Sequence, residues 1–566
     1  MFYLLTKYFL KLCAAFFFQE VDRVGEHHTP ITGPLIICGN HSNQFVDPLL
    51  ILSQCKRETS FLIAESSYRK RIVGFFAKLL HAIPVKRPQD YAKKGTGKIC
   101  SDASGKIQGI GTKFTLEVKP GDMIKATSVE FTIKSVDSDD LITPLSPISD
   151  LKNSEFKILP KIDQSEIYEA VQNELKRGRC IGIFPEGGSH DRTTPLPLKA
   201  GVCLMALGAM ARYNITVTIQ CIGLNYYQGH RFRSKAVINF GVPYSIPREL
   251  ATLYLQDRKQ AIEILLRQIE SRMKEVWVTA PSYEELSHVF MARRVFKPDD
   301  MENPSKLMEM NIKFAKGYRY IKEKYPDCEE FKTAINLATD YTKNLKLLGL
   351  KDSQVRSSKL SKGTFLIQTI FSIIRILLAF VLSLPTWVIA VVLGTLIYKQ
   401  AEKERQKALA SSSVKIHGWD VLASFKIIYG FTYFAIFSLL LGIFVFFYSV
   451  CNFYADLFGS YYDALSIYLT FLIIWPGYMY VSIILSDRAL GNFTKTYVRA
   501  LSMCSPKAIN SVIQQREQLK QSVKALVKKF MPEIFPELKH KKNKSTYELN
   551  DSINDAFGFL SEIGFS

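Results

Sequence analysis

Residues 427–450, IIYGFTYFAIFSLLLGIFVFFYSV, and residues 464–485, ALSIYLTFLIIWPGYMYVSIIL, decide the broad architecture of this chain. Neither stretch contains a charged side chain. A helix needs about 20 apolar residues to cross a bilayer core of about 30 Å. The sequence therefore predicts two transmembrane helices within residues 427–485.

A third apolar block, residues 363–398, is interrupted by Arg375 and Pro385. One straight helix of this length would exceed the bilayer core, and an internal proline bends or breaks a helix. The block is therefore either one span or a hairpin that turns at Pro385. We expect a membrane hairpin, because of the charges on either side of the apolar blocks.

Basic residues flank these blocks unevenly. Five lysines and arginines lie in residues 399–415 and the tail after 485 is again basic, whereas residues 451–461 contain none. Loops rich in lysine and arginine stay on the cytoplasmic side of a membrane. We therefore expect residues 399–426, an amphipathic loop, and residues 486–566, a basic tail, to be cytosolic. A hairpin would keep the residues before 363 on the same side.

The first 20 residues are apolar but include Lys7 and Lys11, and they show no convincing cleavage site of a signal peptide. Residues 1–20 are therefore expected to form an amphipathic helix in the membrane interface. A core helix of the domain that follows is the alternative interpretation.

Residues 21–300 alternate short apolar runs with helical patterns. PLIICG (34–39), CIGIF (180–184) and ITVTIQCIG (215–223) have the length and composition of buried strands. Strands that alternate with helices predict an α/β sheet. Residues 95–160 differ, because their alternating runs and turn residues predict a small β-rich insertion. Residues 301–362 have the pattern of a polar helical connector to the membrane part.

The composition limits the possible functions. The chain has 566 residues, a formal net charge of +21 and 47% hydrophobic residues, which excludes a disordered protein and indicates an anionic partner. The cations gather at the membrane flanks, so attraction to anionic membrane phospholipid explains them and no nucleic acid is expected. Ten scattered cysteines without a C-x-x-C pair suit a reduced, cytosol-facing protein.

The first candidate site is GNHSNQFVDP (39–48), directly after a predicted strand. The turn between a strand and a helix is the usual place for a ligand in an open α/β sheet. His41 could act as a general base if Asp47 holds one ring nitrogen while the other nitrogen accepts a proton. An isolated histidine at such a turn would more often cap the helix.

The second candidate site is GIFPEGGSHDRTTPLPLKAG (182–201), in which a strand again ends at a glycine-rich turn before a helix. Gly187 allows backbone amides to approach an anion closely, and Lys199 precedes the helix N-terminus. Glu186 would suit hydroxyl groups or cations better than an anion. An ordinary surface turn is the alternative.

Cations follow two further predicted strands. Arg87 lies in HAIPVKR, and Arg231 and Arg233 lie in GHRFRS. Each alone is an ordinary surface cation. Because the clusters each follow a strand, they point together to one phosphate-binding pocket at one edge of the sheet.

The strings NHSNQFVDP, IPVKR, FPEGGSHDRT with PLKAG, and the apolar strand before GHRFRS resemble, in order, the four acyltransferase blocks of glycerolipid synthesis. TAPSYEEL with MARRVF, and SSVKIHGWDVLASFK, resemble the fungal-type glycerol-3-phosphate/dihydroxyacetone-phosphate acyltransferases, which are membrane-bound. The likeness covers residues 1 to about 540. Five residues separate His41 from Asp47, where the broader superfamily has four.

The resemblance implies an α/β acyltransferase domain over residues 21–300 and a C-terminal α-helical membrane domain. It implies acyl transfer from acyl-CoA to the sn-1 hydroxyl of glycerol 3-phosphate, with dihydroxyacetone phosphate as a second acceptor. The product, lysophosphatidic acid, would serve phospholipid and triacylglycerol synthesis. His41 would be the base and Asp47 would orient it. Acyl-CoA is a co-substrate, and neither a metal nor a cofactor is expected. The residues implied to bind substrate are Glu186, Gly187, Arg87, Lys199, Arg231 and Arg233.

The resemblance also implies a multi-pass protein of the endoplasmic reticulum membrane, with its catalytic domain facing the cytosol. Two other functions stay open. One is acylation of a lysophospholipid such as 1-acylglycerol 3-phosphate, since the same phosphate pocket would serve it. The other is a non-catalytic lipid-binding membrane scaffold, which the presence of His41, Asp47 and Glu186 together disfavours.

Overall fold

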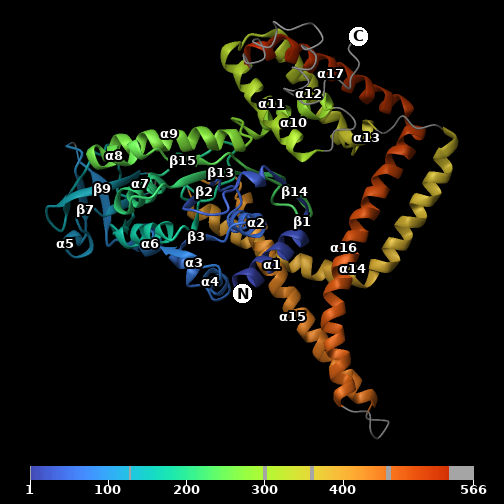
Figure 1. The fold of residues 1–566 in the computed structure, drawn as a ribbon, viewed down its shortest axis with the longest axis horizontal. Helices are drawn as coiled ribbons and strands as arrows, with labels where there is room; N and C mark the ends of the chain where they lie inside the picture. The colour runs from blue at the N-terminus through green and yellow to red at the C-terminus, as the bar shows by residue number, and fades with distance from the viewer. Residues whose placement is uncertain are drawn as a thin grey trace.

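The computed structural model describes residues 2–534 apart from 103, 127–128, 298–302, 357–361, 413 and 454–460. Figure 1 shows an α/β body with a second small sheet at its outer end, a helical bundle beside the body, and long helices that project away from both. The expected tail segment after residue 534 lies outside the described residues.

The α/β body is built on a mixed sheet in the order β1-β14-β13-β2-β12-β3-β4, with β15 paired to β13. Strands β13, β2, β12, β3 and β4 run parallel to one another, so their carboxyl ends share one edge. The strands are β1 (Phe18–Val24), β2 (Leu35–Gly39), β3 (Thr59–Ala64), β4 (Ile83–Val85), β12 (Cys180–Ile183), β13 (Thr218–Tyr227), β14 (Ser234–Phe240) and β15 (Tyr244–Ser245).

Helices cover both faces of this sheet, as the continuous apolar strands predict. In β2, Leu35 and Ile37 pack toward α1 and α2, whereas Ile36 and Cys38 pack toward α6, α7 and α9. The helices are α1 (Phe2–Phe17), α2 (Val46–Gln54), α3 (Glu65–Tyr68), α4 (Arg71–Leu79), α6 (Ser165–Lys176), α7 (Gly201–Tyr213), α8 (Arg248–Gln256) and α9 (Arg258–Val276), with short 3-10 turns η1 (Glu26–His28) and η2 (Pro88–Tyr91).

A second, antiparallel sheet occupies the residues of the expected β-rich insertion. Its strand order is β5-β11-β8-β9-β10-β7-β6, and it has its own apolar core around Phe114 and Ile124. The elements are β5 (Lys93–Lys94), β6 (Lys98–Ser101), β7 (Ile107–Ile110), α5 (Phe114–Glu117), β8 (Met123–Ala126), β9 (Val129–Val136), β10 (Leu141–Pro144) and β11 (Phe156–Leu159).

Helix α1 stands where the interfacial helix was expected, but it ends at Phe17 and β1 follows at once. Leu10 and Cys13 on its inner side are buried in the core of the body. Leu5 and Tyr8 on its outer side are 59% and 68% exposed. The helix therefore belongs to the core, as in the alternative interpretation, and also presents an apolar outer face.

The expected connector is helical, but it is part of a bundle. Helices α10 (Tyr283–Phe296), α11 (Pro304–Lys324), α12 (Glu329–Leu347) and α13 (Asp352–Arg356) pack with α17 (Pro506–Ile534) around a shared core. The described part of the expected tail is therefore folded up to Ile534. Its buried apolar residues Ile509, Val512, Leu519 and Val523 are three, seven and four positions apart, which places them on one face of α17.

Within the described residues, three helices are long and apolar enough to cross a membrane, which indicates a membrane protein. They are α14 (Lys362–Ser411), α15 (Trp419–Phe453) and α16 (Tyr461–Cys504). Helices α15 and α16 contain the two spans predicted within residues 427–485.

The hairpin predicted over residues 363–398 is wrong. Helix α14 runs through Pro385 without ending, and Figure 1 shows that it bends along its course. A proline removes one backbone donor and bends a helix, whereas a turn within a bilayer would leave several backbone groups without partners. One bent helix therefore satisfies more of the backbone than two helices and a turn.

Candidate active site

The loops that carry the two main motifs meet because β2 and β12 are parallel neighbours. Cys38 of β2 pairs with Ile183 of β12 on one side and with Cys221 of β13 on the other. The segments that follow these strands therefore leave the sheet at one edge, as the motif positions predicted.

His41 and Asp47 are in direct contact. His41 Nδ1 lies 2.8 Å from Asp47 Oδ2, and the backbone N–H of Asn43 donates to the same oxygen at 2.7 Å. Asp47 is buried in the first turn of α2, whereas the His41 side chain is 17% exposed. Among the described residues, no hydrogen bond or ion pair reaches Nε2 of His41.

Tyr226 completes the environment of Asp47, and sequence reasoning missed it. Strand β13 extends five residues beyond Ile222, the residue that pairs with the last residue of β2. This extension brings the Tyr226 hydroxyl to Asp47 Oδ1, to which it donates a hydrogen bond. Burial and the charge of Asp47 raise the pKa of Tyr226 well above its ordinary value, so the phenol stays protonated.

Burial also raises the pKa of Asp47, while the bonds from His41, Tyr226 and the Asn43 amide favour its charged form. Oδ2 must be an acceptor, because a backbone N–H can only donate to it. In the neutral imidazole, His41 therefore donates from Nδ1 to Asp47, and Nε2 is the nitrogen that carries the lone pair. The His41 ring stacks on Phe184, with centroids 4.1 Å apart and planes 9° apart, which fixes its orientation.

Glu186 lies beside His41 but does not face a substrate. Its Oε1 accepts the backbone N–H of His41 at 2.9 Å, and its Oε2 accepts the N–H of Leu196 at 2.9 Å and contacts His190 Nε2. The side chain is fully buried. The role of binding acceptor hydroxyls does not fit this geometry, because both oxygens already hold protein groups that join the two loops.

Gly187 and Lys199 pack against each other at the glycine-rich turn. Gly187 has φ +77°, and a Cβ there would lie 2.6 Å from Lys199 Cε. The turn therefore needs glycine both for its backbone conformation and for the lysine stem that crosses it. Lys199 is exposed, and among the described residues its ammonium has no ion pair.

The three arginines have different environments. Arg87 forms a two-bond ion pair with Asp90, at 2.9 and 3.0 Å, and β4 is separated from β2 by β12 and β3. Arg233 pairs with Asp487 of α16 at 2.6 Å and donates to carbonyl oxygens at the end of α1. Arg233 is therefore a structural cation, and the prediction that it binds phosphate does not fit. Arg231 is exposed and has no carboxylate partner in the described chain.

The start of α15 and the loop before it also dock onto this edge. The Asp191 carboxylate accepts the backbone N–H groups of Ile416 and His417 at 2.7 Å each, and of Trp419 at 3.3 Å. Burial would raise the pKa of Asp191, but these amides lower it overall. Ser424 Oγ accepts the N–H of Phe45 at 2.9 Å, directly within the His41 loop.

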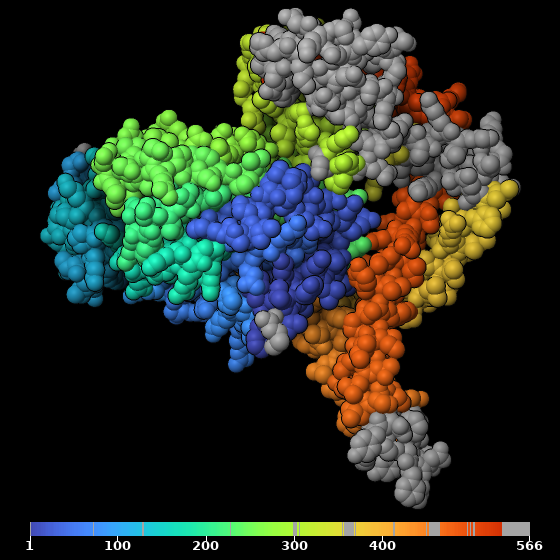
Figure 2. Space-filling model, viewed as in Figure 1, coloured from blue at the N-terminus to red at the C-terminus, as the bar shows by residue number. Residues whose placement is uncertain are grey.

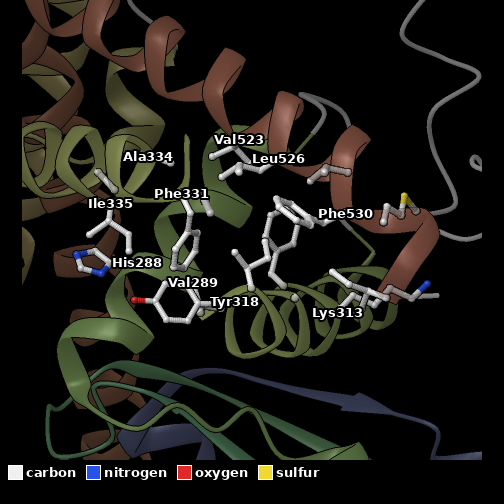
Figure 3. A pocket seen from close by; sticks show the side chains of 18 of the residues that line it. His288, Val289, Lys313, Tyr318, Phe331, Ala334, Ile335, Val523, Leu526 and Phe530 are labelled. Atoms are coloured by element: carbon white, nitrogen blue, oxygen red, sulfur yellow. The ribbon is translucent and has the colours of Figure 1, made fainter. Parts of the chain in front are cut away.

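The described residues also contain an apolar pocket outside the predicted active site, and they offer no metal-binding cluster. Figure 3 shows an apolar pocket in the helical bundle, lined by side chains such as Val289, Phe331, Val523 and Phe530 from α10, α12 and α17. None of the residues predicted for the active site lines it. Within the described residues, no group of three or more His, Cys, Asp and Glu side chains is arranged to hold a metal ion.

Comparison with known proteins identifies the family of this chain. The family described as the glycerol-3-phosphate acyltransferase 2 C-terminal domain matches residues 288–535. An uncharacterized acyltransferase of Schizosaccharomyces pombe is 34% identical over 560 residues, which cover 93% of this chain and 81% of that protein.

Two proteins of Saccharomyces cerevisiae are also similar. Glycerol-3-phosphate O-acyltransferase 1 is 32% identical, with 92% of this chain and 70% of the relative covered. Glycerol-3-phosphate O-acyltransferase 2 is 31% identical, with 73% and 61% covered. The resemblance seen in the motifs is confirmed, and the chain is an acyltransferase that belongs to the family of the yeast glycerol-3-phosphate O-acyltransferases.

Proposed function

We propose that this acyltransferase transfers the acyl group of acyl-CoA to the sn-1 hydroxyl of glycerol 3-phosphate, and also acts on dihydroxyacetone phosphate. The product with glycerol 3-phosphate is lysophosphatidic acid. The observation that carries the proposal is the bond of 2.8 Å between His41 Nδ1 and the buried Asp47, which leaves Nε2 without a hydrogen-bond partner among the described residues. The names of the yeast relatives support the choice of acceptor.

In the proposed mechanism, His41 Nε2 removes the proton of the acceptor hydroxyl as its oxygen attacks the thioester carbonyl of acyl-CoA. The new C–O bond forms, the C–S bond breaks, and the imidazolium returns its proton to the departing sulfur of CoA. Asp47 holds the ring and stabilises the transient positive charge. No step passes through a metal, a cofactor or an acyl-enzyme.

The exposed Lys199 and Arg231 are the candidates for the acceptor phosphate, because Arg87 and Arg233 already pair with carboxylates. We further propose that the α/β body faces the cytosol at the endoplasmic reticulum. The apolar outer face of α1 and the three long apolar helices support placement of the catalytic edge at a membrane surface, where the acyl chain and the lipid product reside.

Two substitutions test the chemistry. His41→Ala should lower kcat by about 10²–10⁴-fold, the usual contribution of a general base. Asp47→Asn should lower kcat by roughly 10²-fold or more with little change in KM, because the neutral amide no longer favours the imidazolium. Steady-state assays of the full chain in nanodiscs would measure both effects, and thermal melts would show whether the variants fold.

His27→Ala is a matched control, because His27 is exposed on η1 and has no contact with this edge. Its activity should stay normal. Near-normal turnover in folded His41→Ala would contradict the mechanism. Glycerol 3-phosphate, dihydroxyacetone phosphate and 1-acylglycerol 3-phosphate offered separately with labelled acyl-CoA would identify the acceptor, and transfer to the last compound alone would contradict the proposed function.

A further inference from the structure

Helix α15 contributes a lysine to the edge of the sheet that carries His41. Trp419 and Lys426 lie two turns apart on one face of α15, at its body-facing end. The Lys426 ammonium donates to the backbone oxygen of His230 at 2.7 Å, and the His230 ring stacks on Trp419 with centroids 4.9 Å apart. This face of α15 is therefore in contact with the loop that follows β13.

The same loop contacts the His41 loop. Asn43 Nδ2 donates to the oxygen of Gly229 at 3.4 Å, and Gly229 directly precedes His230. Ser424 of α15 separately contacts the backbone of Asn43 and Phe45. Lys426 therefore binds His230, the residue next to the Gly229 that contacts the catalytic loop, and Ser424 holds α15 to the catalytic loop directly.

Two cations around this loop, Lys426 and Arg231, form no ion pair with a carboxylate among the described residues. Arg231 is next to His230, is exposed, and has no ion pair within the described residues. Glu402 is the carboxylate whose charge acts on Lys426, and it already forms bonds of 2.9 and 3.0 Å with Arg405. Burial, and then the positive charges of Lys426 and Arg231, lower the pKa of His230 to about 4. Both cations therefore act on the His230 ring.

Neighbouring like charges destabilise a folded protein unless an anion joins them. A phosphate group supplies up to two negative charges and several acceptor oxygens, which suits a lysine and an arginine side by side. The cations predicted from the sequence did not include Lys426, because it lies next to an apolar span and has the pattern of a membrane-flanking lysine.

We propose that Lys426 and Arg231 together bind the phosphate group of the acceptor, so that membrane helix α15 completes the active site. This inference rests on the proposed function, and it adds a residue of the C-terminal domain to the site. There are two alternative roles. Lys426 would be a structural residue that only binds the His230 carbonyl, or the two cations would bind the phosphates of acyl-CoA.

Kinetics separate these roles. Lys426→Met and Arg231→Met should each raise the KM for glycerol 3-phosphate by roughly 10- to 100-fold, the effect of losing one charge-assisted hydrogen bond, with the KM for acyl-CoA changed less than about twofold. Lys426→Arg should restore most of the affinity. The matched control is Lys403→Met, since Lys403 is an exposed lysine of α14.

A binding experiment keeps this inference separate from the proposed function. Isothermal titration of the full chain in nanodiscs with glycerol 3-phosphate, and with inorganic phosphate, requires no acyl transfer. Weaker binding of both by the two methionine variants, with unchanged binding by Lys403→Met, supports the site even if another acceptor is used in catalysis.

Unchanged binding and unchanged KM in folded Lys426→Met would overturn the proposal and leave Lys426 as a structural residue. A rise in the KM for acyl-CoA alone would overturn it as well, by assigning the cations to CoA. Should Lys426→Met unfold, as a thermal melt would show, Arg231→Met gives the deciding measurement, because Arg231 is exposed and makes no side-chain bond in the described chain.

Discussion

The carboxylate of Glu186 joins two loops that are far apart in the sequence. It holds the backbone of His41 from one loop and His190 and Leu196 from the other, and it is buried. Burial would raise its pKa, but the bonds from His190 and from the two backbone amides lower it overall below the ordinary 4.5. The charged form therefore stabilises the native position of His41.

A lowered carboxyl pKa implies a stability that is present above the ordinary pKa and lost as pH falls through the lowered value. Glu186→Gln should therefore unfold at a Tm several degrees below the native protein near neutral pH. This gap should narrow as pH falls below about 4.5, because the unfolded chain binds a proton on Glu186 there and the native protein does so only at its lower pKa. Thermal melts of both proteins from about pH 7 to about pH 2.5 would measure it, and a gap independent of pH over that range would contradict the assignment.

At the scale of elements, α15 is held against the sheet by its first turns. Asp191 binds three backbone amides of residues 416–419, and the Lys415 ammonium donates to Ser189 at 3.0 and 3.1 Å and pairs with Asp420. These contacts join the glycine-rich loop to the membrane helix. Asp191 therefore holds the segment that leads into α15, together with Lys415, Ser424 and Lys426.

Asp191→Ala should release the segment before α15. We expect cleavage within residues 412–418 by a soluble protease to become roughly 10-fold faster, since the lost caps lower the local free energy of opening. Activity should fall as well, because Lys426 and Ser424 lose their positions. Asp163→Ala is the control, since the Asp163 carboxylate also accepts a backbone N–H at the start of a helix, that of Ser165 in α6. Unchanged cleavage in Asp191→Ala would show that other contacts hold the segment.

At the scale of the molecule, α15 and α16 form an antiparallel pair that projects from the body. Figure 2 shows this pair extending well beyond the α/β body. Cys451 lies near the end of α15 that is distant from the active site, whereas Cys504 ends α16 beside the helical bundle. Both cysteines are exposed. If the pair crosses a membrane, these two thiols lie on opposite sides.

A thiol reagent that cannot cross membranes should therefore label Cys504 but not Cys451 in sealed vesicles with their cytosolic face outward. Detergent should make both thiols reactive. Variants Cys451→Ser and Cys504→Ser would assign each signal in a mass-spectrometric readout. Labelling of Cys451 in intact vesicles would exclude a crossing by α15 in this orientation.

The sequence by itself determined the features that depend on local pattern. The lengths of the apolar runs predicted the two spans, because a helix must match the bilayer thickness. The strand-and-turn motifs predicted that His41 and Glu186 leave one edge of a parallel sheet, and the register of β2 and β12 agrees with this. Spacing within ten residues was enough to pair His41 with Asp47.

Only the tertiary structure decided which partner each polar group takes. Arg233 appeared free in the sequence, yet it pairs with Asp487, 254 positions later. Tyr226 reaches Asp47 because β13 continues beyond the end of β2. Lys426 reaches the His230 loop because Asp191 and Ser424 bind the start of α15 and the loop before it. A short stretch of sequence shows its own hydrophobic periodicity and charge. Long-range packing decides which distant group forms the hydrogen bonds of a buried carboxylate or guanidinium.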